Sequence, residues 1–402
     1  MTSTRQEVTD PEASGHADPD LADPEMVRLL GPDGALRSDA EYSPYVADVD
    51  AEMLRGFYRD MALTRRFDEE ATALQRQGQL ALWVPLRGQE AAQIGSGRAT
   101  RPQDYIFPTY REHGVALTRD VDFPQMLRIF RGISNGGWDP RENNFHMYTM
   151  VLAAQMPHAT GYAMGVQRDQ AGWDRARLEK DGTAVVAYFG DGASSEGDVH
   201  ESMVFAASYT SPVVFFCQNN QWAISVPFHV QSRVPLADRA RGYGFPGVRV
   251  DGNDVLAVLA VTRWALERAR RGDGPALIEA YTYRMSAHTT ADDPTKYRLG
   301  ADERAWVEKD PISRLEKHLR AEGHADDDFF ARVAADGDAM AARVRREALA
   351  FEPPELAQSF GNVYAEAHPL IQEELRWHRE YEAGFDDGAA PDAGTTAGED
   401  AR

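Results

Sequence analysis

Two short polar motifs at the ends of apolar segments are the residues of this sequence best suited to chemistry. The motif Gly190-Asp191-Gly192 follows one β-rich apolar run, and Asn219-Asn220 follows the next. A helical stretch lies between the two runs, so the strands they predict should be parallel and end at the same edge of one sheet. Ligands bind at that edge in open parallel sheets. We therefore predict a binding site formed by these two motifs.

The carboxylate of Asp191 determines which ligand the predicted site can hold. Glycines and a following helix favour a phosphate, because they bring backbone amides close to the anion. A carboxylate repels that phosphate by roughly 4 kcal/mol per charge pair at about 4 Å and an effective dielectric near 20. A Mg²⁺ ion between them reverses the sign, since it binds protein oxygens together with phosphates. We expect oxygens from Asp191, from Asn220 and from a backbone carbonyl just beyond it.

The plain alternative is that both motifs are solvated turns, which either motif alone would favour. Competing phosphate motifs are missing, because the chain contains neither GxxxxGK[ST] nor GxGxxG after a strand. A Schiff-base lysine is disfavoured too, since all four lysines stand in charged surroundings. The combination of the two motifs across one crossover favours the phosphate site.

Apolar runs that alternate with helical stretches predict the fold that positions these motifs. We expect an α/β fold with a doubly wound, mostly parallel sheet, helices on both faces, and helical N- and C-terminal extensions. Residues 104–114 are predicted as a loop that runs into a helix, and residues 132–161 as a loop whose length is typical of a functional loop. The expected strands are 183–189, 212–217, 248–250 and 276–283, and the expected helices include 50–78, 89–97 and 254–270.

Composition excludes several classes of protein. The 402 residues carry a net charge of −21, whereas a nucleic-acid-binding protein is expected to be basic. The single cysteine cannot form an intramolecular disulfide, which favours a reducing, cytoplasmic environment. The sequence contains no run of 18 apolar residues, so we do not expect a membrane-spanning helix. The N-terminal residues do not resemble a secretory signal.

Charge and composition also divide the chain into a body and two tails. Residues 1–50 hold 12 acidic and 3 basic residues and are poor in β-branched and aromatic residues. Such segments bury too little apolar surface to offset the entropy of ordering. We predict acidic, largely disordered tails over 1–44 and 384–402, and one folded domain with helical extensions over 45–383.

A larger set of motifs carries a resemblance to a known family. From about residue 50 to residue 381 the chain resembles the alpha subunit of the decarboxylating component of 2-oxo acid dehydrogenase complexes, closest to the branched-chain type. That resemblance implies the thiamine diphosphate-binding fold, with thiamine diphosphate and Mg²⁺ as cofactors. The matching segments are RGQEAAQIG (87–95), YREHG (110–114), LAAQMPHATG (152–161), YFGDGASSEGDVHE (188–201), FFCQNNQWAIS (215–225), RVDGND (249–254), YRMSAHTTADDPTKYR (283–298) and DPISRLEKHL (310–319).

The resemblance implies a role for each matching residue. Asp191 and Asn220 would bind Mg²⁺ through their side chains, and Trp222 through its carbonyl. Leu152 would be the apolar wedge that keeps the cofactor bent. His288 would be the catalytic residue, which binds phosphate or assists acyl transfer to the lipoyl group. The residues that correspond to the family's cofactor-binding positions are Tyr110, Arg111, Leu152, Gly190, Asp191, Gly192, Ala193, Asn220, Arg284 and His288.

This sequence departs from the mammalian branched-chain members at three positions near the implied site. Gln218 replaces an arginine, which removes one positive charge. Met150 replaces a serine near the substrate. Thr289 replaces the serine that is phosphorylated in mammals, so regulation by phosphorylation is not assumed.

The resemblance also implies partners. The glutamate that activates the cofactor belongs to a separate beta subunit, so we expect the chain alone to be inert and an α2β2 heterotetramer to be active. The substrate would be a 2-oxo acid such as 3-methyl-2-oxobutanoate, and the acyl acceptor the lipoyl domain of the acyltransferase component. Two alternatives stay open: an alpha subunit of pyruvate or acetoin dehydrogenase, and a non-catalytic acidic scaffold.

Overall fold

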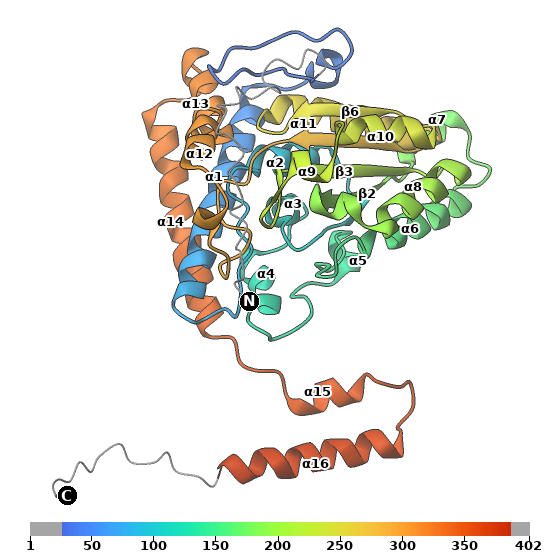
Figure 1. Ribbon diagram of the computed structural model, residues 1–402, viewed down its shortest axis with the longest axis vertical. Helices are drawn as coiled ribbons and strands as arrows, with labels where there is room; N and C mark the ends of the chain where they lie inside the picture. Colours follow the sequence, from blue (N-terminus) through green and yellow to red (C-terminus); the bar gives the residue numbers. More distant parts are fainter. Residues whose placement is uncertain (1–25, 387–402) are drawn as a thin grey trace, which may run out of the picture.

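A parallel sheet forms the centre of the protein in the computed structural model, which describes residues 26–386 (Figure 1). The strand order is β1-β2-β3-β7-β6, and every neighbouring pair runs parallel. This arrangement confirms the predicted α/β class. The strands are β1 (Tyr105–Phe107), β2 (Val185–Gly190), β3 (Val213–Asn219), β6 (Gly247–Asp251) and β7 (Ala276–Tyr281).

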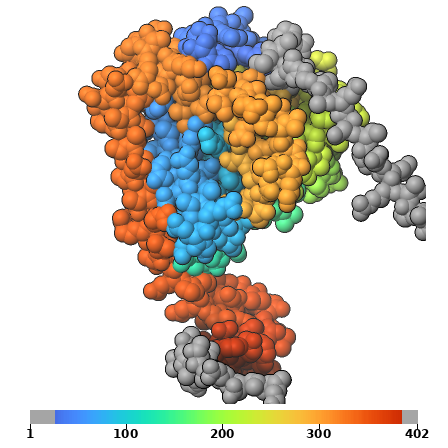
Figure 2. Space-filling model, turned by 60° about the vertical axis from the view of Figure 1, so that its left-hand side comes forward, coloured from blue at the N-terminus to red at the C-terminus, as the bar shows by residue number. Residues whose placement is uncertain are grey.

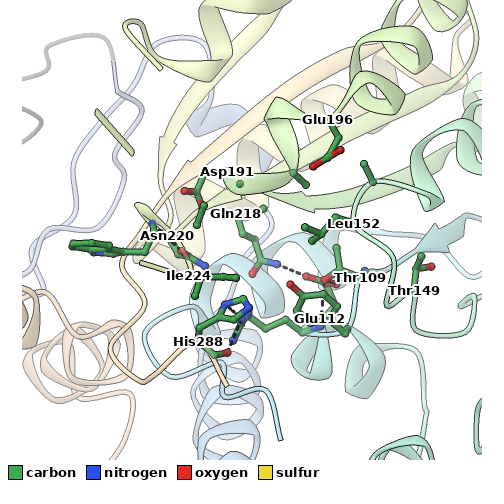
Figure 3. A pocket seen from close by; sticks show the side chains of 18 of the residues that line it. Thr109, Glu112, Thr149, Leu152, Asp191, Glu196, Gln218, Asn220, Ile224 and His288 are labelled. Carbon is green, nitrogen blue, oxygen red and sulfur yellow. Dashed lines mark hydrogen bonds between the residues drawn. The ribbon is translucent and has the colours of Figure 1, made fainter. Parts of the chain in front are cut away.

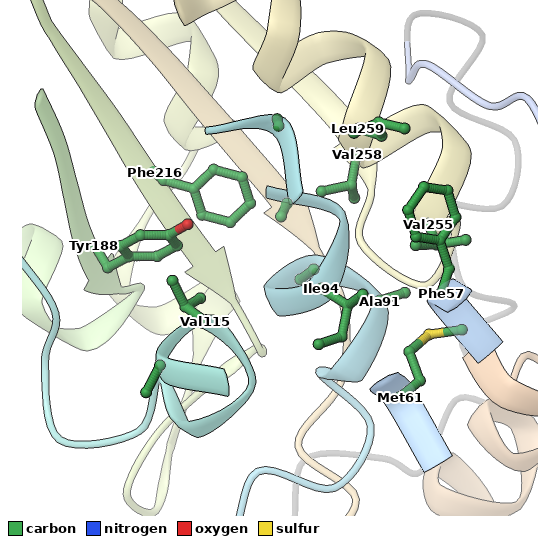
Figure 4. Packing of buried hydrophobic residues seen from close by; sticks show 14 of the residues in the cluster. Phe57, Met61, Ala91, Ile94, Val115, Tyr188, Phe216, Val255, Val258 and Leu259 are labelled. Atoms are coloured by element: carbon green, nitrogen blue, oxygen red, sulfur yellow. The ribbon is translucent and has the colours of Figure 1, made fainter. Parts of the chain in front are cut away.

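Both faces of the sheet are buried, which explains why its strands are apolar runs in the sequence. Tyr188 and Phe216 point into the core beneath α2 and α11, where their rings lie 5.1 Å apart (Figure 4). The alternating residues, such as Ala187 and Phe215, belong to a second core on the other face. The covering helices are α2 (Glu90–Ala99) and α11 (Val255–Arg270) on the first face, and α6 (Gln155–Asp169), α8 (Gly197–Tyr209) and α10 (Leu236–Tyr243) on the second.

A layer of long helices packs outside α2, on the first face of the sheet. Helix α1 (Ala51–Arg76) begins at Asp50, whose side chain accepts a hydrogen bond from the Met53 N–H and caps the helix. It lies beside α14 (Asp327–Leu349) and α13 (Pro311–Ala321) (Figure 1). Its buried residues recur at helical spacing, which confirms the predicted helix.

Shorter elements connect these layers and extend the chain. A two-stranded antiparallel hairpin pairs β4 (Trp222–Ala223) with β5 (Val226–Pro227) directly after β3. Between Met26 and Asp386, no helix has the length and apolar character needed to cross a bilayer. The remaining helical segments are η2 (Ser43–Val46), α3 (His113–Thr118), α4 (Phe123–Phe130), α5 (Pro140–Asn143), α7 (Arg175–Asp181), η3 (Gly192–Ser195), α9 (Phe228–Gln231), η4 (Pro294–Lys296), α12 (Gly300–Val307), α15 (Leu356–Gly361) and α16 (Pro369–Asp386).

Residues 26–44 do not form the solvated tail that composition predicted. The backbone of Val27 donates to the Arg249 carbonyl and accepts from the Asp251 N–H, so it covers the free edge of β6. Buried Asp254 accepts hydrogen bonds from the backbone N–H groups of Leu29 and Leu30. Charge counting missed this segment because its few apolar residues lie within an acidic stretch. Residues 1–25 and 387–402 of the predicted tails lie outside the described residues.

Two segments predicted as loops also contain regular structure. Residues 105–107 form strand β1, whose three residues are all buried. The short strand lacked a recognisable apolar run because Asp104 directly precedes it and Pro108 directly follows it. Within 132–161, α5 occupies Pro140–Asn143 and α6 begins at Gln155, so the loop is shorter than predicted.

Candidate functional site

A cavity of about 280 Å³ opens where β2 and β3 end (Figure 3). Parallel pairing aligns Gly190 with Gln218, so Asp191 and Asn220 leave the sheet at the same edge. This is the arrangement expected from the spacing of the two motifs. The predicted site residues that line the cavity are Tyr110, Arg111, Leu152, Gly190, Asp191, Gly192, Ala193, Asn220, Trp222 and His288.

Asp191 is a buried carboxylate with few hydrogen-bond donors. Its Oδ2 accepts one hydrogen bond from Gln231 Nε2 at 3.0 Å. Burial raises the pKa of Asp191 to about 6, although the hydrogen bond from Gln231 and the charge of Arg284 act in the opposite direction. A buried carboxylate is costly without a positive partner, so this position favours a bound cation.

Two further oxygens lie just beyond β3. The Asn220 side chain donates to Gln89 Oε1 at 3.2 Å, while its Oδ1 accepts from the Trp222 N–H at 3.3 Å. The Trp222 carbonyl accepts from Arg284 at 3.1 Å and keeps a second lone pair. Arg284 itself is fully buried behind the cavity, where it also donates to the Ile224 carbonyl. It holds the 222–224 backbone in place.

The donor set suits a hard divalent cation. Within residues 26–386, no group of three or more His, Cys, Asp or Glu side chains could hold a metal by itself. The available oxygens are one carboxylate, one amide and one carbonyl, a set that fits Mg²⁺ better than Zn²⁺. The backbone at Gly192 lies close to the β4–β5 hairpin. A Cβ at this position would lie 2.8 Å from the Ala223 Cβ, so any side chain would displace the hairpin.

Arg111 and His288 also line the cavity and complete its polar, sheet-edge side. Arg111 is buried and donates to the Pro85 carbonyl, to the His288 carbonyl at 3.0 Å and to His288 Nδ1 at 3.2 Å. Burial, together with the charges of Arg111 and Arg284, lowers the pKa of His288 to about 3. Guanidinium groups only donate, so Nδ1 must accept and the neutral ring carries its proton on Nε2. The ring of Tyr110 lies edge-on, 6.4 Å away.

The other side of the cavity is an apolar rim that solvent reaches. Val151, Leu152 and Ile224 are 70%, 47% and 53% exposed. Ile224 has φ of 54°, and Ala153, also in the lining, has φ of 66°. A β-branched residue rarely adopts this left-handed conformation, and such strain concentrates at functional sites. We define Val151, Leu152 and Ile224 as the apolar rim.

Sequence reasoning missed several residues of the lining. Buried Glu112 accepts from the Thr109 hydroxyl at 2.6 Å and from Gln218 Nε2 at 2.6 Å, and Gln93 donates to Gln218 in turn. Gln155 Oε1 is buried without a hydrogen-bond partner. Most of these residues lie in or beside the motifs quoted above, and their position in the sequence could have identified them as part of the site. The missed lining residues are Gln89, Thr109, Glu112, Thr149, Val151, Ala153, Gln155, Glu196, Ala223 and Ile224.

Comparison with known proteins places the chain in a family. The sequence model of the dehydrogenase E1 component family matches residues 58–347. A 3-methyl-2-oxobutanoate dehydrogenase subunit alpha from Mycobacterium tuberculosis is 44% identical over 362 residues, which cover 88% of this chain and 94% of that protein. A pyruvate dehydrogenase E1 component subunit alpha from Acholeplasma laidlawii is 34% identical over 336 residues, 83% of this chain and 94% of that protein. The chain belongs to the dehydrogenase E1 component family.

Proposed function

We propose that this member of the dehydrogenase E1 component family is the alpha subunit of a 3-methyl-2-oxobutanoate dehydrogenase. It would act with a beta subunit in the oxidative decarboxylation of a branched-chain 2-oxo acid, with acyl transfer to a lipoyl domain. The observation that carries the proposal is the pair of strand ends that brings Asp191 and Asn220 into one cavity. The 44% identity to the mycobacterial alpha subunit supports the substrate, since the pyruvate relative matches at 34%.

Thiamine diphosphate and Mg²⁺ are the cofactors that fit these residues. When bound, thiamine diphosphate supplies the nucleophilic carbon that takes up the acyl group as carbon dioxide leaves. The oxygens of Asp191, Asn220 and Trp222 would hold Mg²⁺, and the backbone at Gly190, Gly192 and Ala193 would face the diphosphate. Arg111 would direct its guanidinium at the same group.

The remaining residues orient groups and hold a proton. His288 would present its Nε2–H to the reacting groups, with the ring fixed by Arg111 and Arg284. Leu152 would press on the cofactor from the rim, and Tyr110 would pack beside His288. Arg284 would act indirectly, through the backbone of residues 222–224.

The beta subunit would complete the site. Two carboxylates besides Asp191 line the described cavity, but Glu112 is engaged by Thr109 and Gln218, and Glu196 is exposed beside α8. The acid that activates the cofactor would therefore come from the beta subunit, which would also cover the apolar rim. Residues 45–383 would form the cofactor-binding domain. Buried, unpaired Cys217 supports a reducing, cytoplasmic environment.

The test is to purify the chain together with its beta subunit. We expect thiamine diphosphate binding, measured by calorimetry, to require Mg²⁺. We expect kcat/KM for 3-methyl-2-oxobutanoate to exceed that for pyruvate by at least about tenfold, because the pocket must accommodate two more methyl groups. A preference for pyruvate or turnover of acetoin would assign the chain to those dehydrogenases. If thiamine diphosphate did not bind in a Mg²⁺-dependent manner, the result would favour the non-catalytic scaffold.

A further inference from the structure

A second cavity lies at the amino ends of the strands, opposite the sheet edge that carries Asp191. It has a volume of about 730 Å³ and lies where α2 and α11 end, before the chain enters β1 and β7. Figures 1 and 2 show the segment that contains η2, in dark blue, on the outside of the body. This segment packs on α11 and forms the outer wall of the cavity. We define it as the arginine cavity, because its lining includes Arg98, Arg101, Arg263 and Arg270.

Helix α2 spans the space between the two cavities. Gln89, which directly precedes the helix, lines the first cavity, whereas Arg98 and Ala99 in its last turn line the arginine cavity. The 10 residues of this helix extend over about 15 Å. The two cavities share no lining residue, so the arginine cavity is a separate site.

Arg101 differs from the other three arginines because it has no carboxylate partner. Its Nη1 donates to the carbonyls of Glu179 and Lys180 at 2.8 Å and 3.3 Å, and it forms no ion pair within residues 26–386. Its Nε and Nη2 therefore stay available to a ligand. The other three arginines are paired: Arg98 with Asp60, Arg263 with Asp48 and Arg270 with Asp104.

Arg270 places a second positive charge beside Arg101. Burial lowers the pKa of Arg101, and the charge of Arg270 acts in the same direction, whereas Asp104 and Glu267 oppose both. Arg270 is only 3% exposed, and its Nε and Nη2 donate to Asp104. Its Nη1 makes no hydrogen bond in the described part of the chain, and a buried donor without an acceptor is costly. An anion in the cavity would accept hydrogen bonds from both arginines.

The size of the cavity and the spread of its donors select an extended anion. Arg263 and Arg270 lie seven residues apart on α11, which is about 10 Å along the helix axis. A single phosphate is too small to contact both, whereas a chain of phosphoryl groups offers oxygens to several guanidinium forks. Pro44 and Tyr45 add an apolar wall, and the Glu267 carboxylate can accept hydrogen bonds from sugar hydroxyls.

We propose that the arginine cavity binds a nucleoside di- or triphosphate. Arg101 and Arg270 contact the phosphoryl groups, and the base lies against Tyr45 in the outer wall. The chain as a whole has a net charge of −21 and repels polyanions, so binding depends on the arginines that meet in this cavity. It should weaken as salt rises, because Arg101 is only partly buried.

Titration calorimetry of the full chain with ATP tests the site, with EDTA present so that the first cavity holds no cation. We expect one ATP to bind per chain. Arg101→Ala should weaken this binding by at least about tenfold, because charged hydrogen bonds to a phosphoryl group are lost. Arg101→Lys keeps the charge without the fork and should lose less. The matched control is Arg332→Ala, which removes an exposed arginine from α14 and should bind like the unchanged chain.

The first cavity also presents an arginine to phosphates, so Arg111→Gln separates the two sites. Loss of ATP binding in Arg111→Gln but not in Arg101→Ala would overturn the proposal, as would the absence of ATP binding by the unchanged chain. Inorganic triphosphate should bind more weakly than ATP, and equal affinity would contradict a nucleotide ligand. Urea unfolding checks that each variant is folded. None of these results bears on the proposed function, which is judged by Mg²⁺-dependent cofactor binding and turnover of the αβ complex.

Discussion

The two sides of the cavity differ in how much of their structure this chain supplies. The sheet-edge side, with Asp191, Asn220 and Arg111, is buried and held by hydrogen bonds from several elements. The apolar rim is about half exposed or more and includes a strained backbone at Ile224. The fold of this chain thus positions the polar side chains of the cavity, whereas the apolar rim remains exposed and is the surface that we propose a partner buries.

The most severe way to break the sheet-edge side is Asp191→Asn. We expect the Mg²⁺-dependent affinity for thiamine diphosphate to fall by about 100-fold or more, because outer-shell changes alone typically cost about 10- to 100-fold. The unfolding free energy should stay equal or rise, since the variant removes a buried charge and keeps an acceptor for Gln231. Calorimetry of the αβ complex and urea unfolding of the chain measure the two quantities.

An equal loss of stability and affinity in Asp191→Asn would contradict this expectation, because Asp191 would then be structural. The matched control is Asp198→Asn, which removes an exposed carboxylate from the first turn of α8. It should leave cofactor affinity unchanged.

This difference between the two sides also separates what the sequence could and could not reveal. Asp191 and Asn220 were predictable because strand ends follow apolar runs, and parallel pairing brings neighbouring ends together. Ile224 was not predictable, since a positive φ leaves no signature in a β-branched residue. Val27 was missed for a similar reason: it covers the edge of β6 through backbone hydrogen bonds that composition does not record.

The remaining site residues could not be predicted from the sequence alone, because their surroundings depend on contacts between segments that are distant in the chain. Glu112 looked like a charged residue in a short motif, yet it is buried because Thr109 and Gln218 both donate to it. The roles implied for Leu152 and His288 came only from resemblance, since each residue alone is an ordinary apolar or polar side chain. They remain predictions until variants are measured.

The apolar rim is probed by Leu152→Ala. We expect kcat of the αβ complex to fall by about 10- to 100-fold, because the cofactor would be less well aligned for reaction. Mg²⁺-dependent cofactor affinity should change little, since the polar groups proposed to hold the diphosphate stay in place. The isolated chain should keep its unfolding free energy within about 0.5 kcal/mol, because Leu152 is half exposed. Kinetics, calorimetry and urea unfolding test these three statements.

Leu152→Met keeps the volume of the side chain and should restore most of the activity. If Leu152→Ala instead lowered cofactor affinity as strongly as Asp191→Asn, the rim would share the binding role of the sheet edge. The contrast between the two sides would then be lost.

The smallest expected effect concerns a residue behind the sheet-edge side. His113 is buried, stacks on Trp83 with ring centroids 4.4 Å apart, and contacts the Tyr148 hydroxyl and the Val84 carbonyl. Burial lowers its pKa to about 3, and the charge of Arg111 acts in the same direction. The neutral ring satisfies both contacts, with Nε2–H donating to Val84 and Nδ1 accepting from Tyr148. His113 thereby supports the backbone of Val84, next to Pro85, whose carbonyl accepts from Arg111.

The unfolded chain binds a proton at this histidine below about pH 6.5, whereas the folded chain does so only near pH 3. Stability is therefore complete above that range and falls as the pH drops through it, by about 1.4 kcal/mol between about pH 7.5 and 5.5. His113→Gln should remove that part of the pH dependence, measured by urea unfolding at both values, whereas His368→Gln, on an exposed histidine, should not. An unchanged pH dependence in His113→Gln would mean that the support behind Arg111 tolerates a charge, and that the sheet-edge side is less closed than its burial indicates.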